Sequence, residues 1–155
     1  MDNLNHNTEK LLVGGRVAYI YRLLLEKQNF GTIEDWEKDV LSFLIEWHSD
    51  TDHITVQTSG STGQPKNVRI LKDWMKYSAQ QTCNFFGLNE RSTIHLCLPA
   101  AFIAGKMMIV RGILSNCTLL ISKPASNPFA DITTQVDFTA ITPHQLFESL
   151  STLSK

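Results

Sequence analysis

Two patterns of apolar and polar positions divide the chain into an N-terminal part and a longer remainder. From residue 32 to residue 47 the apolar residues recur mostly at spacings of three and four, which is typical of one face of an α-helix. The stretch 9–28 predicts an earlier helix, although Gly14 and Gly15 weaken its first half. Residues 1–50 are therefore expected to form a helical N-terminal lead.

After residue 53 the pattern changes to short strand-like runs that take turns with helical segments. Helices are expected at 73–86, at 103–114 and from Pro143 onwards, and strands at 54–58, 67–71, 93–98, 118–121 and 137–141. Strands that alternate with helices indicate an α/β fold, with a partly parallel sheet flanked by helices. We assign residues 51–155 to this α/β part.

Composition excludes several classes of protein. The 155 residues carry 14 Lys and Arg against 15 Asp and Glu, so bulk charge gives no basis for nucleic-acid binding. The apolar runs fall well short of the roughly 20 residues that a membrane span needs, and the polar N-terminus does not resemble a signal peptide. Cys83, Cys97 and Cys117 form no CxxC pair. We expect a cytoplasmic protein with buried cysteines, without nucleic-acid or membrane partners and without a metal site of its own.

The segment TSGSTGQPK, residues 58–66, carries the clearest chemical signal in the chain. Two glycines allow a tight turn, and three hydroxyls together with successive backbone N–H groups suit anionic oxygens. Lys66 adds a positive charge at the end of the segment. The spacing differs from that of a Walker A loop, GxxxxGK[ST], so a P-loop NTPase is not indicated. On composition alone, a plain solvent-exposed turn remains an alternative.

The order of these residues resembles the phosphate loop of the adenylate-forming superfamily, written [ST]SG[ST]TGxPK, which includes acyl-CoA synthetases. The resemblance implies a loop that holds the β- and γ-phosphates of ATP while a carboxylate attacks the α-phosphate, giving an acyl-adenylate and pyrophosphate. It implies an AMP-forming acid–CoA ligase that uses ATP, Mg²⁺ and coenzyme A on an aromatic or acyl carboxylate. The phosphate-binding residues that it implies are Thr58, Ser59, Gly60, Ser61, Thr62, Gly63 and Lys66.

Two segments further along the chain extend the resemblance towards the acyl site of this superfamily. LPAAFIAG, residues 98–105, is similar to an LPLFHxxG stretch, and DFTAITPHQL, residues 137–146, is similar to a later segment of the VPTQL type. The acyl-pocket residues implied in this way are Phe102, Gly105, Lys106, His144 and Gln145. Phe102 stands where the family often carries His, which leaves the acid substrate open.

The run IAGKMMIVR, residues 103–111, is most similar to o-succinylbenzoate–CoA ligases of menaquinone biosynthesis. Lys106 and Arg111 would suit a dicarboxylate, because cations pair well with carboxylates. The alternative is that they are surface or helix-flanking charges.

Motifs that the family carries later in its chains, including a YGxTE-like segment and a C-terminal catalytic lysine, are not found here. We therefore expect the N-terminal part of the large domain of a longer ligase, with no catalytic residue of its own and no activity alone. The alternative is a non-catalytic, stand-alone binding module with a relic phosphate loop. The sequence does not fix an oligomeric state.

Overall fold

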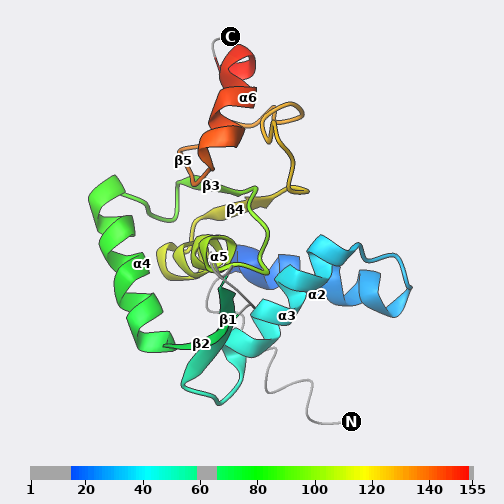
Figure 1. Cartoon of the computed structure of the whole chain (residues 1–155), viewed down its shortest axis with the longest axis vertical. Coiled ribbons are helices and arrows are strands. Elements are labelled where there is room, and N and C mark those ends of the chain that lie inside the picture. Colours follow the sequence, from blue (N-terminus) through cyan, green and yellow to red (C-terminus); the bar gives the residue numbers. More distant parts are fainter. Residues whose placement is uncertain (1–14, 59–65, 154–155) are drawn as a thin grey trace.

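The computed structural model describes residues 15–58 and 66–153 of the chain (Figure 1). The described elements follow one another as α2 (Gly15–Asn29), α3 (Asp35–His48), β1 (His53–Thr58), β2 (Lys66–Leu71), α4 (Lys72–Phe86), β3 (Thr93–Leu96), α5 (Ile103–Ser115), β4 (Thr118–Ile121), β5 (Phe138–Thr139) and α6 (Pro143–Leu153). No helix in these ranges is long and apolar enough to cross a membrane.

The strands form two separate sheets. β1 and β2 pair as an antiparallel hairpin, with Thr58 opposite Lys66 at the loop end. The second sheet has the order β4-β3-β5, and both pairings are parallel. The expected α/β class with a partly parallel sheet flanked by helices is confirmed.

The parallel sheet is covered on one face by α5. Gly112 of this helix lies so close to the sheet that a Cβ built on it would be 3.5 Å from Ile94 Cδ1 and 3.5 Å from Leu119 Cβ. β3 is the central strand, and Ile94, His95 and Leu96 are all buried there. Burial on both faces is typical of a strand in a parallel sheet.

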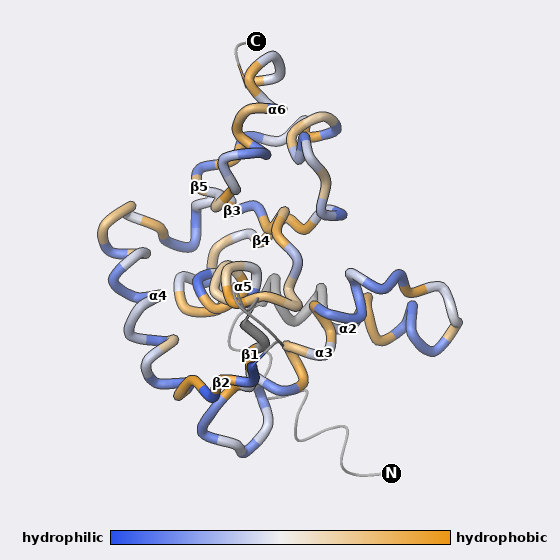
Figure 2. Tube along the Cα trace, in the orientation of Figure 1, coloured by the Kyte–Doolittle hydropathy of each residue, from blue (hydrophilic) through white to orange (hydrophobic). Residues whose placement is uncertain are grey.

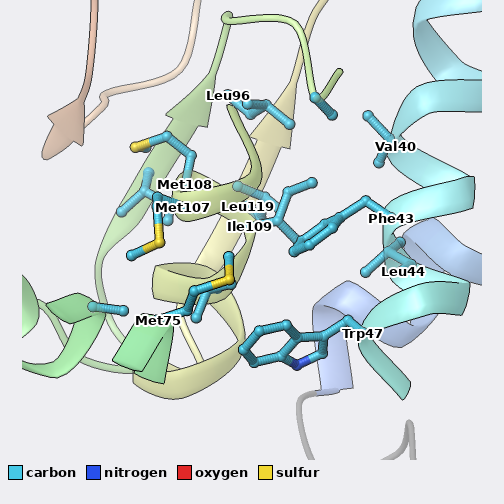
Figure 3. Close-up of a cluster of buried hydrophobic side chains, with 14 of the residues drawn as sticks. Val40, Phe43, Leu44, Trp47, Met75, Leu96, Met107, Met108, Ile109 and Leu119 are labelled. Carbon is cyan, nitrogen blue, oxygen red and sulfur yellow. The ribbon is translucent and has the colours of Figure 1, made fainter. Parts of the chain in front are cut away.

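The main core lies between α3, α5 and the parallel sheet. Figure 3 shows Val40, Phe43, Leu44 and Trp47 of α3 beside side chains of α5, β3 and β4. Phe43 is fully buried, and its ring centroid lies 5.9 Å from that of Trp47. The apolar face expected between residues 32 and 47 is therefore the face that α3 buries.

Several ends of elements differ from the sequence-based expectation. The helix predicted from residue 32 begins at Asp35, because the Thr32 hydroxyl donates to Lys27 O at the end of α2 (3.2 Å). Glu37 provides the cap, since its Oε2 accepts from the Glu34 N–H (2.9 Å). β3 and β5 are shorter than expected, whereas α4 ends at Gly87 (φ 66°) as predicted.

All three cysteines are buried and free, as expected. Burial raises the pKa of each thiol, because the apolar surroundings disfavour the thiolate. Reactive thiols need the opposite environment, so these cysteines contribute packing and not chemistry.

Candidate functional site

The predicted phosphate loop connects the two strands of the β1–β2 hairpin. Thr58 is the last residue of β1, and Lys66 is the exposed first residue of β2. The remaining predicted phosphate ligands, Ser59, Gly60, Ser61, Thr62 and Gly63, lie outside the described residues. A Walker A loop runs from a strand into a helix, so the hairpin setting agrees with the spacing argument against a P-loop NTPase.

The end of the hairpin away from the loop is held by two helices. The Glu46 carboxylate of α3 accepts from the Thr55 N–H (3.1 Å). The buried Lys72 of α4 donates through Nζ to Ser49 O (2.8 Å), and its backbone N–H donates to Asp52 O (2.8 Å). Burial lowers the pKa of Lys72. The hairpin thus presents its loop from a base fixed to α3 and α4.

A chain of polar side chains adds to that base. His53 Nδ1 lies 2.7 Å from Asp52 Oδ1, and Arg69 Nε donates to His53 Nε2 (2.9 Å). His53 Nε2 is therefore the acceptor, and Nδ1 carries the proton that it donates to Asp52. The hydrogen bond from His53 lowers the pKa of Asp52. The hydrogen bond between Arg69 of β2 and His53 of β1 links the two strands of the hairpin.

The second group of predicted residues gathers at the carboxyl end of the parallel sheet, where open α/β sheets commonly bind ligands. Gln145 is 6% exposed and lies in the first turn of α6. Its Nε2 donates to Cys97 O (3.3 Å) after β3 and to Ala125 O (2.9 Å) after β4. Its Oε1 accepts from the Thr142 N–H (3.0 Å), and the Gln145 N–H donates to Thr142 Oγ1 (3.1 Å). One side chain thus joins the segments that follow all three strands.

Three other predicted acyl-pocket residues lie at the start of α5. Phe102 occupies the N-cap position with half of its surface exposed. Gly105 packs directly on the turn after β3, where a Cβ would come within 2.3 Å of Pro99 O. Lys106 is buried, and its Nζ lies 4.8 Å from the centroid of the Phe43 ring. Desolvation lowers the pKa of Lys106.

The structure therefore brings the predicted acyl residues to two helix starts at one end of the sheet. His144 is exposed beside the buried Gln145 on α6, and Phe102 is exposed at the start of α5. Lys106 instead points towards Phe43 in the core. Arg111 is half-buried further along α5, and its guanidinium carbon lies 5.9 Å from the Phe138 ring centroid.

Sequence reasoning missed a pocket of about 430 Å³ beside β5. It is lined by residues of the 129–141 segment and the end of α6, mainly Phe129, Ile132, Val136, Phe138, Ile141 and Leu153. None of the five predicted acyl residues lines it. The apolar residues scattered through the otherwise polar segment 129–141 are the sequence feature that could have indicated this pocket. In the described ranges, no three His, Cys, Asp or Glu side chains stand together as metal ligands would.

His95 is a fully buried ionisable group on the central strand. Its Nε2 lies 2.7 Å from Ser122 Oγ, its Nδ1 has no hydrogen-bond partner in the described structure, and its ring meets that of Phe129 edge-on. Burial lowers the pKa of His95, because the charged imidazolium loses its hydration.

We expect the free energy of unfolding to decrease as the pH falls below about 6.5, the ordinary histidine pKa. In this window the unfolded chain binds a proton that folded His95 resists, so protonation favours unfolding. The measurement is urea denaturation at several pH values. His95→Gln keeps a hydrogen-bonding amide for Ser122 without a titrating group, so its stability should change less over the same window. Equal dependence of the unfolding free energy on pH in the two proteins would contradict the assignment to His95. Half-buried His48, whose pKa is also lowered by burial, contributes the same pH dependence to both proteins.

No protein-family model matches the chain, and a search of curated proteins gives no significant match. Among solved structures, the chain is similar to an acyl-CoA synthetase (AMP-forming)/AMP-acid ligase II-like protein from Dyadobacter fermentans DSM 18053. The TM-score is 0.71 and the sequence identity 30%, over 78% of this chain and 35% of that protein. The chain thus spans about a third of the length of this relative. The similarity supports the assignment of the chain to the adenylate-forming superfamily.

Proposed function

We propose that this chain is the N-terminal part of the large domain of an AMP-forming acid–CoA ligase, with residues 1–50 as a helical lead and 51–155 as an incomplete nucleotide-binding subdomain. The observation that carries the proposal is the order-specific TSGSTGQPK segment at the tip of a hairpin. It occurs in a chain whose fold is similar to part of an AMP-forming acyl-CoA synthetase.

The donors of this segment suit a polyphosphate. Between Thr58 and Lys66 the sequence offers hydroxyls, backbone N–H groups and one cation, and it contains no carboxylate that would repel phosphate. The hairpin fixes Thr58 and Lys66 opposite each other at the two ends of the loop. In this proposal the segment binds the β- and γ-phosphates of ATP, and ATP supplies the adenylyl group that activates the acid. Mg²⁺ and coenzyme A belong to the complete enzyme, and no residue described here is assigned to them.

The acyl group is proposed to bind at the carboxyl end of the parallel sheet. The exposed Phe102 and His144 are the side chains available to contact it there. Gly105 and Gln145 would shape the site, since Gly105 allows α5 to approach Pro99 and Gln145 holds the segments after the strands. Lys106 would place a buried positive charge next to the site, where its Nζ lies over the Phe43 ring.

We propose o-succinylbenzoate as the acid, which would place the enzyme in menaquinone biosynthesis. The support is the resemblance of the IAGKMMIVR run to ligases of this acid. Lys106 lies over the Phe43 ring and Arg111 beside the Phe138 ring, so neither cation adds to this support. An assay of the complete ligase with o-succinylbenzoate, benzoate and a medium-chain fatty acid tests this. Preference for either monocarboxylate would contradict it.

Lys66→Ala and Gly63→Val should each lower ATP–pyrophosphate exchange by the complete ligase at least about tenfold. The lysine change removes a charge-assisted contact of roughly 1.5–3 kcal/mol, and the valine places a branched side chain where the backbone must approach phosphate closely. Lys76→Ala is the matched control, because Lys76 is an exposed lysine of α4 whose partner is Asp73.

Unchanged ATP–pyrophosphate exchange in both loop variants would contradict the proposal that the loop binds the phosphates of ATP. Exchange that is absent from the unsubstituted protein, together with no measurable Mg–ATP binding, would favour a stand-alone module with a relic loop.

A further inference from the structure

The solvent-facing side of α4 carries aromatic residues, whereas the outer face of a surface helix normally carries charged and polar ones. Trp74, Tyr77 and Phe85 are 69%, 69% and 83% exposed. Together with the exposed Gln81 they follow one another at spacings of three and four residues, so they form one stripe along the helix. Figure 1 shows α4 as the outermost helix on its side of the molecule, with α5 on its inner side. The stripe is thus accessible along its whole length.

The stripe on α4 has no net charge. All four of its residues are uncharged, and the flanking Asp73 and Lys76 form an ion pair with each other (2.9 Å). A nucleic acid or an anionic membrane surface would instead require a cluster of Lys and Arg. The stripe therefore suits a partner surface that is itself aromatic and uncharged.

The C-terminal end of the stripe is hollowed. An open pocket of about 580 Å³ is lined there by Gln81, Thr82, Asn84, Phe85 and Phe86. The two phenylalanine rings meet edge to face, with 5.0 Å between their centroids, and Figure 2 shows this hydrophobic end of α4 at the outer edge of the molecule. An indole ring placed in the hollow would find apolar surface on these rings and an acceptor for its N–H on a neighbouring amide oxygen. The hollow therefore suits a large aromatic side chain.

Trp74, at the other end of the stripe, is such a side chain. It precedes Phe85 by eleven positions, which corresponds to about three helical turns and roughly 16 Å along the axis. If two α4 helices pack antiparallel about a two-fold axis at the middle of the stripe, Trp74 of each copy meets the hollow of the other. Tyr77 of each copy then lies opposite Gln81 of the other, and every contact is made twice. Residues spaced by three and four along the stripe suit the shallow crossing of about 20° that such a long contact needs.

The area available on the stripe is that of a weak but specific dimer. Because Trp74, Tyr77 and Phe85 are each more than two thirds exposed, these side chains of two copies would together bury up to roughly 900 Å². The other residues of the hollow raise the total to about 1,000 Å², the size that a specific interface should reach. Interfaces at this lower limit dissociate readily, so the dimer is expected to depend on concentration.

We propose that the outward stripe of α4 is a two-fold interface between two copies of this chain, in which Trp74 of each copy packs against Phe85 in the hollow of the other. A second copy is the occupant because the projecting ring and the hollow lie on the same helix face, three turns apart, and because the stripe is neutral. The interface lies away from the phosphate loop and from the acyl residues at the starts of α5 and α6, so it does not depend on the activity of the protein.

Sedimentation equilibrium of residues 1–155 at increasing concentration tests the interface. The unsubstituted chain should show a monomer–dimer equilibrium, and Trp74→Lys and Phe85→Glu should each raise its dissociation constant at least tenfold. Phe147→Glu is the matched control, because Phe147 is an equally exposed aromatic (70%) that lies on α6 and outside the stripe, and it should leave the dissociation constant unchanged. Circular dichroism checks that each variant is folded, and all three positions are exposed.

Mixing the two stripe variants tests the antiparallel arrangement itself. In a dimer of one copy of each, the introduced lysine faces the introduced glutamate at one end, while the remaining Trp74 and Phe85 meet at the other. The 1:1 mixture should therefore associate at least about tenfold more tightly than either variant alone. A parallel arrangement would place position 74 on position 74, and mixing would restore nothing.

Three results would each overturn the proposed dimer. They are a chain that stays monomeric up to about 1 mM, where association is negligibly weak, a dimer that Phe147→Glu weakens as much as the stripe variants do, and a mixture that associates no better than its components. A concentration-dependent dimer that both stripe variants weaken and their mixture restores supports the proposal.

Discussion

Gly105→Ala is expected to lower the free energy of unfolding by about 3 kcal/mol, at the upper end of what overpacking costs. A Cβ at this position would lie 2.3 Å from Pro99 O, 2.7 Å from Pro99 C and 2.9 Å from Ala100 N. All three are backbone atoms, and the turn they belong to is held by the Phe102 N–H donating to Pro99 O (3.2 Å). Relief would require α5 to move away from the end of β3. Urea denaturation followed by circular dichroism measures the loss.

Gly112→Ala is the matched control in the same helix. There the added Cβ would meet Ile94 and Leu119 side chains at 3.5 Å, which is ordinary contact. Because alanine favours a helix interior over glycine by about 0.8–1 kcal/mol, this variant should be as stable as the unsubstituted protein or more so. Equal stabilities of the two alanine variants would contradict the close approach of α5 to Pro99.

Phe43→Ala is expected to cost about 3–5 kcal/mol, the usual range for removing a buried phenylalanine. Phe43 is fully buried and joins α3 to α5, through its contact with Trp47 on its own helix and with Lys106 across the interface. The substitution opens a cavity and also leaves the buried ammonium of Lys106 without the ring beneath it. Thermal or urea denaturation measures the change.

Phe30→Ala provides the comparison, since Phe30 is 81% exposed after the end of α2. Its effect should stay within about 0.5 kcal/mol. If Phe43→Ala were no more costly than Phe30→Ala, the core between α3 and α5 would not be as the structure places it.

Most elements of the fold could be predicted because their signals are local. The apolar spacing of α3, the Gly87 stop of α4 and the Pro143 start of α6 each depend on a few neighbouring residues. Their exact ends were predicted less well. The sequence pattern starts the helix at residue 32, but the Thr32 hydroxyl donates to Lys27 O at the end of the preceding helix, and α3 begins at Asp35.

In the candidate site too, some features could be predicted from adjacent residues and others depend on contacts between distant segments. The order of residues from Thr58 to Lys66 is a sequence property, and it led directly to the superfamily that the structural relative supports. The acyl residues were harder to interpret. The resemblance implies Gln145 as an acyl-pocket residue. In the structure its side-chain amide hydrogen-bonds to Cys97, Ala125 and Thr142, which are up to 48 residues away in the chain.

The sequence by itself determined the α/β class, the phosphate-loop signature and the apolar faces, because periodicity, turn residues and residue order are carried by adjacent positions. Only the tertiary structure decided which strand lies at the edge and which side of α6 is buried. Strand order and side-chain environment depend on contacts between distant segments, such as Phe138 with Phe86 and Ser149 with Asn127. For that reason α6 could be located from Pro143 in the sequence, while its outward apolar face and the placement of Arg111 beside the Phe138 ring of β5 could not.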